Sequence, residues 1–290
     1  MANTLDGILL IDKPEGPTSH DVIYKLRRHL GLRQIGHAGT LDPLATGLLV
    51  CLLGRATKLS PYLTGHRKRY HLRIVLGSAS NTYDREGEII PANPPDVTQE
   101  ALEAAVRAFP RRYDQTPPPF SAKKIAGKPA YKLARKGDEV ELKSVAVDIY
   151  ELTVTGFDYP RADLVCEVSA GTYIRSLAVD LARQLGTVAY LERLQRLTSG
   201  PFRLDDAVRL DDLLRMPPQA AAECVLDVSA GVKDFPRVDL DEPANQQFVA
   251  GQRVTVEGPP GFTAVFCGDR FIGFGEIENG RLRPRRVLYR

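Results

Sequence analysis

Apolar residues recur every three to four positions in parts of the chain, a spacing that places them on one face of a helix. Val22, Leu26 and Leu30 follow this spacing, with Ser19 before them and Gly31 after them. Serine is a favoured N-cap and glycine a common stop signal, so we predict an amphipathic helix that Ser19 caps and Gly31 ends. The same criteria predict two further helices, over residues 98–109 and 171–186.

Short apolar runs and strictly alternating runs predict strands. These runs are residues 7–11, 48–53, 69–76, 141–154 and 163–168. Strands and helices follow one another without a regular strand–helix–strand rhythm. We therefore predict an α+β fold with a mixed, largely antiparallel sheet and flanking helices.

Two parts of the chain differ from the rest in composition and hydrophobic pattern. Residues 110–130 are rich in proline, glycine and lysine, which predicts a loop. After about residue 232 helix signals vanish, and short apolar runs separated by glycine turns predict strands. We therefore predict two domains, residues 1–232 and a small β-rich domain of residues 233–290.

Basic residues are clustered, although the net charge of the 290-residue chain is only +3. Residues 55–73 hold six lysines and arginines without an acid, residues 121–136 hold another six, and the last ten residues add five arginines. Segregated positive charge favours a polyanionic partner such as a nucleic acid. The alternative is a set of solvated basic faces.

The four cysteines and five histidines form no recognisable metal or disulfide motif. The cysteines lie more than forty residues apart, and Cys51 and Cys166 stand in apolar runs, which indicates core thiols in a reducing compartment. The histidines lack ligand spacing, and no glycine-rich phosphate or dinucleotide motif is present. We therefore expect chemistry that needs no metal and no cofactor.

No segment reads as a targeting or membrane-spanning sequence. The N-terminal apolar run Ile8–Ile11 is too short for a signal peptide, and no run approaches membrane-spanning length. We therefore expect a cytoplasmic protein without a membrane partner.

Asp42 stands in an unusual setting. It carries the only formal charge in the segment HAGTLDPLATG, residues 37–47, and carboxylates are costly to remove from water unless they are paired. Three interpretations stay open: a turn residue, one member of a glycosidase carboxylate pair, or a lone ionised nucleophile or electrostatic anchor beside a cation. Arg175, at the start of the predicted helix in GTYIRSL, could supply that cation or could cover its own helix.

Motifs along nearly the whole chain resemble the TruB family of tRNA pseudouridine synthases. They are LLIDKPEGPTS, GHAGTLDPLATGLL, KRYHLRIVLG and GTYIRSLAVDL, in that order. PPPFSAKKIAGKPAYKLARKG, within residues 110–140, resembles the family's basic RNA-gripping insertion, LQRLTSGPF resembles its late-core segment, and residues 233–290 resemble its PUA RNA-binding domain. The resemblance implies the pseudouridine synthase fold and isomerisation of the uridine at position 55 in the tRNA T-loop.

The resemblance also implies catalytic roles for three residues. Asp42 matches the catalytic aspartate, which assists breakage of the N1–C1′ glycosidic bond before the uracil rejoins through C5. Arg175 matches the arginine that pairs with this aspartate and favours its charged form. Tyr70 matches the active-site tyrosine, whose ring can stack on the extruded uracil and whose phenol is placed to remove the C5 proton.

Four further positions match residues around the family's substrate pocket: Lys13, His37, Tyr173 and Leu194. Lys13 matches a lysine near the catalytic loop, and His37 matches a histidine that fills space in the T-loop as bases flip out. Asp84 matches a second acidic position, but Asn81 stands where many members have aspartate. We therefore leave that loop out of the predicted site.

The partner that the resemblance implies is tRNA, bound through its T-arm stem-loop by a monomeric enzyme. The alternative from another class is a non-catalytic RNA-binding protein or tRNA-folding chaperone on the same fold. Release of tritium from uracil C5 of labelled tRNA distinguishes the two.

Overall fold

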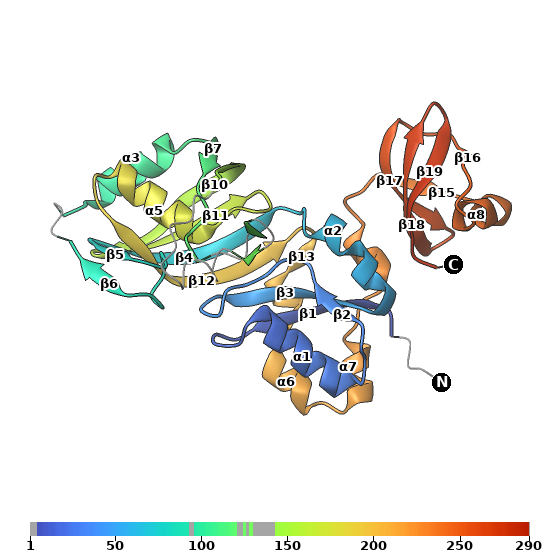
Figure 1. Ribbon diagram of the computed structural model, residues 1–290, viewed down its shortest axis with the longest axis horizontal. Helices are drawn as coiled ribbons and strands as arrows, with labels where there is room; N and C mark the ends of the chain where they lie inside the picture. The colour runs from blue at the N-terminus through green and yellow to red at the C-terminus, as the bar shows by residue number, and fades with distance from the viewer. Residues whose placement is uncertain (1–4, 93–95, 121–123, 126–127, 130–142, 290) are drawn as a thin grey trace. The chain divides into compact units, whose positions relative to one another are not determined.

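The computed structural model describes residues 5–92, 96–120, 124–125, 128–129 and 143–289 of the chain (Figure 1). The chain forms two compact units. The first comprises Met1–Pro43, Gly47–Thr64 and Ser199–Arg290, and the second comprises Leu44–Thr46 and Gly65–Thr198. Helices and largely antiparallel strands occur in both units, so the predicted α+β class is confirmed.

The first unit is built around β1 (Gly7–Lys13) and β3 (Thr46–Leu53), which pair antiparallel from Gly7 opposite Leu53 to Lys13 opposite Gly47. Because this pairing ends at Lys13 and Gly47, the turn after β1 and the loop before β3 leave the sheet side by side. That loop carries Asp42. The other elements of this part are α1 (Ser19–Leu30), β2 (Ile35–His37), η1 (Gly54–Leu59), α2 (Ser60–Leu63), β13 (Phe202–Arg203), η2 (Leu204–Asp206), β14 (Val208–Arg209), α6 (Leu210–Arg215), α7 (Pro218–Glu223) and η3 (Val228–Gly231).

Helix α1 is capped by Thr18 and not by Ser19. The Thr18 hydroxyl accepts a hydrogen bond from the Asp21 backbone N–H at 3.1 Å, and the Asp21 carboxylate accepts from the Thr18 N–H at 2.8 Å. This is a capping box. The prediction of Ser19 as the cap was wrong because the buried Ser19 hydroxyl bonds instead to the backbone of Leu41. The predicted end at Gly31 is confirmed by its left-handed φ of 65°.

The second unit contains strands in the order β12-β4-β11-β10-β7. Their bounds are β12 (Ala189–Ser199), β4 (Lys68–Leu76), β11 (Arg161–Val168), β10 (Val145–Asp158) and β7 (Arg112–Gln115). Helix α3 (Gln99–Ala108) contacts both β10 and α5 (Ile174–Gln184), and β5 (Ser78–Ser80) pairs with β6 (Ile89–Pro91) as a hairpin (Figure 1). Asp84 belongs to the loop of this hairpin. These elements carry most of the predicted catalytic residues.

The predicted loop over residues 110–130 contains strand β7, so that prediction was wrong in part. Tyr113 and Gln115 face inward while Arg112 and Asp114 are exposed, and β7 pairs with β10. The alternation is hard to see in the sequence because neither inward residue is aliphatic. Two short strands, β8 (Lys124–Ile125) and β9 (Lys128–Pro129), also pair with each other. The rest of the basic stretch 121–142 lies outside the described residues.

Arginines of the basic run in β4 and just before it pair with carboxylates of neighbouring strands. The pairs are Arg67–Glu167, Arg69–Glu151 and Arg73–Asp163, at 4.0, 2.9 and 2.8 Å. These acids come from β10 and β11, so the basic run lacks acids along the sequence but not in the folded sheet. The solvated-face interpretation therefore suits these three arginines better than a phosphate-binding patch.

Residues after 232 form a five-stranded sheet in the order β15-β17-β18-β19-β16. The strands are β15 (Arg237–Asp239), β16 (Val254–Thr255), β17 (Gly261–Cys267), β18 (Arg270–Glu278) and β19 (Arg281–Val287). A helix, α8 (Glu242–Val249), was not predicted, although Asp241 caps it and a proline stands in its first turn. Its Phe248 is fully buried in the small core beneath the sheet.

The C-terminal sheet also shares apolar contacts with η1 and α2. The Tyr62 ring lies 5.3 Å from that of Phe262 and 4.5 Å from that of Phe274, centroid to centroid. The Lys58 ammonium donates to the Leu288 carbonyl at 3.1 Å. Residues 54–63 therefore rely on the C-terminal sheet to cover part of their apolar surface.

Candidate active site

The loop that carries Asp42 is tied on both sides of the aspartate to the turn after β1. The Ser19 hydroxyl donates to the Leu41 carbonyl at 3.0 Å and accepts from the Leu41 N–H at 2.8 Å. The Gly16 N–H donates to the Pro43 carbonyl at 2.9 Å. Leu41 and Leu44 are buried, so Asp42 stands half-buried between apolar neighbours in a fixed backbone. The motif DKPEGPTS thus serves to hold the motif GTLDP.

Lys13 is fully buried at the same place. Its ammonium donates to the carbonyls of Pro14 at 2.9 Å and of Pro43 at 3.3 Å. A buried ammonium is costly unless it is hydrogen-bonded, and both of these acceptors belong to the turns around Asp42. Lys13 therefore lies beside the loop that carries Asp42, and its contacts suit a role in holding that loop.

His37 ends β2 and lines a groove of about 560 Å3 between α1, β2 and η1. Its ring lies edge-on to that of His20, with centroids 5.7 Å apart. The described residues that line the groove include Arg27 and Arg33 but no acid. Arg27 donates to the Ile35 carbonyl at 2.6 Å, whereas Arg33 is exposed and has no ion pair among the described residues.

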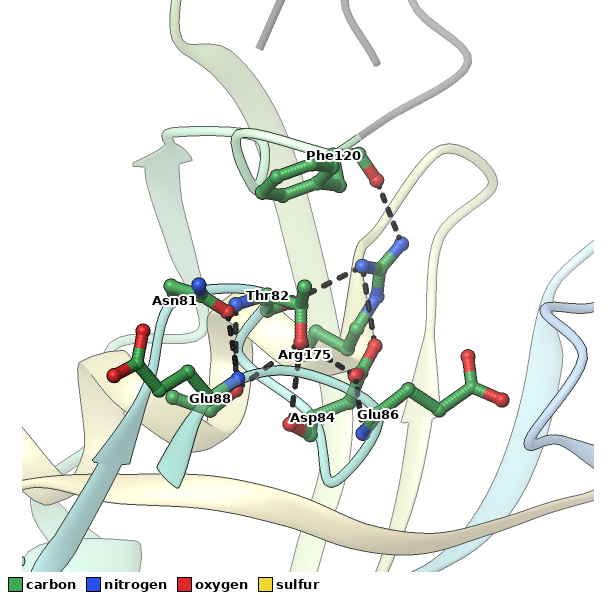
Figure 2. A network of polar contacts seen from close by, with 8 residues as sticks. Asn81, Thr82, Asp84, Glu86, Glu88, Phe120 and Arg175 are labelled. Carbon is green, nitrogen blue, oxygen red and sulfur yellow. Dashed lines mark hydrogen bonds and ion pairs between the residues drawn. The ribbon is translucent and has the colours of Figure 1, made fainter. Parts of the chain in front are cut away.

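Arg175 lies in the first turn of α5 and forms a buried ion pair with Asp84 (Figure 2). Its guanidinium lies 3.3 Å from the Asp84 carboxylate, and the two side chains are 7% and 4% exposed. It also donates to the carbonyls of Thr82 and Phe120, each at 3.1 Å. Arg175 is therefore a fixed internal cation and does not simply cover its own helix.

Asp84 is held in its turn by three groups at once. One carboxylate oxygen accepts from the Thr82 hydroxyl at 2.6 Å and from the Glu86 N–H at 3.0 Å, and the other faces Arg175 (Figure 2). Gly87 closes the turn, because a Cβ there would collide with side-chain oxygens from residues 80, 81 and 82. The sequence interpretation left this loop out of the site because of Asn81. The structure adds Asp84 to it as the partner of Arg175.

The three remaining predicted residues lie in the same unit as Arg175. Tyr70 is 7% exposed and faces the buried side of β4 with Leu72, opposite to the arginines described above. Leu194 is 7% exposed on β12, where its carbonyl accepts from the Thr46 hydroxyl at 3.4 Å. Tyr173 is the N-cap residue of α5. The Asp84 turn bonds to β12 as well, since Arg85 and Leu191 share a backbone hydrogen bond of 3.0 Å.

Lys68, two residues before Tyr70 on the same buried face, adds a titratable cation to this unit. Burial, and then the nearby Arg196, lower the pKa of its ammonium to about 8. Its ammonium donates to the His66 carbonyl at 2.8 Å. The positive charge on this face of the sheet therefore falls as the pH rises above neutrality.

Models of one protein family match successive parts of the chain. A model for the N-terminal domain of TruB family pseudouridylate synthases matches residues 27–174, just over half of the chain. The chain belongs to the TruB family. A model for the C-terminal domain of tRNA pseudouridylate synthase B matches residues 175–232, and one described as pseudouridine synthase II TruB, C-terminal, matches residues 236–288.

TruB relatives align with this chain over nearly their full length. It is 37% identical to the tRNA pseudouridine synthase B of Aquifex aeolicus, over 98% of this chain and 100% of that protein. It is 40% identical to the enzyme of the same name from Stutzerimonas stutzeri, over 98% and 96% of the two chains. The Thermobifida fusca protein of that name is also 40% identical, over 96% and 97%.

Solved structures share the fold at lower sequence identity. A chain from the structure of an H/ACA RNP bound to a substrate RNA containing 2′-deoxyuridine superposes with a TM-score of 0.76 at 20% identity, covering 99% of this chain and 86% of that one. A chain of an archaeal box H/ACA sRNP complex gives 0.74 at 22% identity, covering 98% and 86%. The predicted fold is therefore confirmed.

Two further features bear on the chemistry of this TruB chain. Among the described residues, no group of three or more histidine, cysteine, aspartate or glutamate side chains is placed to hold a metal ion. Within the same residues, no helix is both long and apolar enough to cross a membrane.

Proposed function

We propose that this chain is a tRNA pseudouridine synthase, an isomerase that converts uridine to pseudouridine at position 55 in the T-loop of tRNA. Membership of the TruB family carries the proposal, because relatives named tRNA pseudouridine synthase B align with nearly the whole chain. The setting of Asp42 supports it. Asp42 is half-buried, and Ser19 and Lys13 hold the backbone on either side of it. This setting suits a catalytic carboxylate better than a turn residue that faces solvent.

The reaction that we propose is an internal exchange of one bond for another. The N1–C1′ bond breaks with help from the Asp42 carboxylate, the uracil turns, and C5 bonds to C1′. The C5 proton is then lost and N1 gains one, so the product is an isomer and no oxidant or reductant enters. Arg175 supplies the positive charge that the proposed mechanism requires, and Asp84 holds Arg175 in place. Tyr70 stacks on the uracil, and its oxygen receives the C5 proton while its own phenolic proton passes to N1, so the tyrosine ends the step neutral.

The substrate uridine must leave the T-loop before it can react. Base flipping costs a few kcal/mol, and stacking on an aromatic ring such as Tyr70 returns ~1–3 kcal/mol. Tyr173 and Leu194 would line the pocket around the base. Contacts to phosphates hold the RNA in register without reading its sequence, so recognition depends mainly on the shape of the T-loop.

Tritium release tests this function directly. We expect tRNA labelled at uracil C5 to release about one equivalent of tritium, and a transcript with cytidine at position 55 to release only background. Equal release from both transcripts would place the reaction at another uridine. Tight tRNA binding without release would favour the non-catalytic chaperone alternative.

We further propose a cytoplasmic monomer, which cell fractionation and light scattering at assay concentration can test.

The groove beside His37 leads to a prediction about tRNA binding. Arg33 is exposed and, unlike Arg27, has neither an ion pair nor a side-chain hydrogen bond among the described residues, so we expect it to contact an RNA phosphate. Replacing Arg33 by glutamine should weaken tRNA binding and make the log–log salt dependence shallower by roughly 0.7–0.9. Filter binding across a salt series measures both quantities.

The matched control for this variant is Arg28→Gln, which removes an exposed arginine of α1 outside the groove. We expect the control to bind like the wild type, and the maximal rate to be unchanged in both variants. Equal effects of the two substitutions would show that Arg33 acts only through the overall charge of the protein.

We also propose that residues 233–290 are a separate PUA-like RNA-binding domain. One face of their sheet has a core of its own, and a family model matches residues 236–288 alone. Arg281, Arg283 and Arg286 lie exposed on β19 and have no ion pair among the described residues, whereas Arg285 pairs with Glu276. Exposed arginines along one strand suit contact with the body of the tRNA.

A double variant, Arg281→Gln with Arg283→Gln, tests this domain without disturbing its packing. We expect weaker binding of full-length tRNA and a salt slope shallower by roughly 1.4–1.8, twice the value for one phosphate contact. Turnover of an isolated T-arm stem-loop should change little. Deleting residues 233–290 should add a lower melting temperature, because Tyr62 loses its ring contacts. Equal losses on both RNAs for the double variant would contradict the proposed RNA contact.

A further inference from the structure

Gln115, the last residue of β7, is 1% exposed, and its side-chain amide hydrogen-bonds to the backbone of Tyr173. Its side-chain Oε1 accepts from the Tyr173 backbone N–H at 2.7 Å, and its Nε2 donates to the Tyr173 carbonyl at 3.1 Å. Both ends of one amide are therefore used on the backbone of one residue, 58 positions away in sequence.

Tyr173 is the N-cap of α5, whose first turn contains Arg175. Tyr173 makes no side-chain capping bond of its own, and its carbonyl already accepts the first helical hydrogen bond, from Leu177 at 3.0 Å. Helix N-termini need acceptors for their free N–H groups, and Gln115 supplies one from a neighbouring strand. Gln115 therefore fixes where α5 begins.

A chain of hydrogen bonds sets the orientation of the Gln115 amide. Its Nε2 also donates to the Tyr113 hydroxyl at 2.7 Å, and that hydroxyl donates to the Asp180 carboxylate at 3.1 Å. Burial, and then the charge of Asp180, raise the pKa of the Tyr113 phenol, so the hydroxyl keeps its proton. Because the Tyr113 hydroxyl donates this proton to Asp180, it must accept a hydrogen bond from the Gln115 Nε2. The amide is then oriented with Oε1 towards the Tyr173 N–H.

The segment after Gln115 holds the same helix turn. The Ser176 hydroxyl donates to the Thr116 carbonyl at 2.8 Å, and the Arg175 guanidinium donates to the Phe120 carbonyl (Figure 2). We propose that Gln115 is a positioning residue for the isomerisation, which sets the location of the Arg175 guanidinium by fixing the backbone two residues before it. This inference rests on the proposed function, in which Arg175 serves the reaction.

Gln115→Glu keeps the shape of the side chain and removes its donor. The carboxylate still accepts from the Tyr173 N–H, but its second oxygen now faces the Tyr173 carbonyl, and two acceptors repel each other. Small displacements of a positioned group can cost up to 10²-fold in rate. We expect single-turnover pseudouridine formation at pH 8 to fall by about 10- to 100-fold, with tRNA affinity unchanged.

The pH profile separates positioning from a general loss of structure. A buried carboxyl has a raised pKa, so the carboxyl that Gln115→Glu introduces takes up a proton as the pH falls and regains a donor. The rate of this variant should therefore recover several-fold relative to the wild type between pH 8 and pH 6. Gln99→Glu, an exposed change of the same charge on α3, should follow the wild-type profile. A Gln115→Glu profile parallel to the wild type would overturn the inference.

A double-mutant cycle tests whether Gln115 acts through Arg175. Residues that act through one another are not additive, so Gln115→Glu should cost much less in an Arg175→Lys background than in the wild type. Additive losses would overturn the inference. If Gln115→Glu does not fold, Tyr113→Phe serves in the same cycle, because it removes only the hydroxyl that orients the amide. We expect it to slow the reaction by about 3- to 10-fold.

The inference and the proposed function fail in different ways. A wild-type protein without tritium release would refute the proposed function. If the wild-type protein and the Arg175→Lys variant are both fully active, the role of Arg175 is refuted. Loss of activity in Arg175→Lys with no loss in Gln115→Glu would refute only the role of Gln115.

Discussion

Asp42→Asn is expected to abolish pseudouridine formation while tRNA still binds. The asparagine amide has nearly the same shape as the carboxylate but carries no charge and is a poor nucleophile, so it cannot assist departure at C1′. The neighbouring backbone is held by Ser19, Gly16 and Lys13 and not by the Asp42 side chain alone. We therefore expect the loop to keep its shape and tRNA affinity to stay within about tenfold, roughly 1.4 kcal/mol.

Tritium release and filter binding on the same preparations measure the two effects separately. Asp206→Asn is the matched control, because Asp206 is exposed and the change in charge is identical. The control should retain full activity. Conversion at a near wild-type rate by the Asp42→Asn protein would show that the nucleophile is another residue, and a large loss of affinity would show that Asp42 mainly holds RNA.

The sequence predicted those parts of the site whose signals are local. Asp42 drew attention because its neighbours within the motif are small or apolar, and the structure places it between the buried Leu41 and Leu44. The helix after Tyr173 was predicted from its own apolar spacing. Lys13 lies near the Asp42 loop because the pairing of β1 with β3 brings the two turns together, which no local signal in the sequence reveals.

Features that depend on distant residues could not be predicted. The partner of Arg175 is Asp84, which lies 91 positions earlier, and the departure at Asn81 argued against including that turn. The capping role of Gln115 depends on the backbone of Tyr173, which no side-chain pattern reveals. Hydrophobic periodicity also missed α8, because only Phe248 of that helix is fully buried.

Tyr70→Phe is the second large effect that we expect, because it keeps the ring and removes only the phenol. The ring should still stack on the uracil, so tRNA affinity should survive. If the hydroxyl takes the C5 proton, turnover should fall by ~10²-fold or more, a usual scale for a positioned base. Tyr70→Leu should weaken binding as well, by part of the ~1–3 kcal/mol that aromatic stacking supplies.

The structure changes the basis of this prediction. Tyr70 lies within the basic run of residues 55–73, but Arg69 and Arg73 lie on the other face of β4 and pair with acids, while Tyr70 is 7% exposed on the buried face. A nearly buried tyrosine suits contact with one extruded base better than contact with a phosphate backbone. Tyr150→Phe is the control, since Tyr150 is an exposed tyrosine on the neighbouring sheet surface. Single-turnover rates of the two variants decide the question: full activity of Tyr70→Phe would leave the ring with a packing role and assign the base to another group.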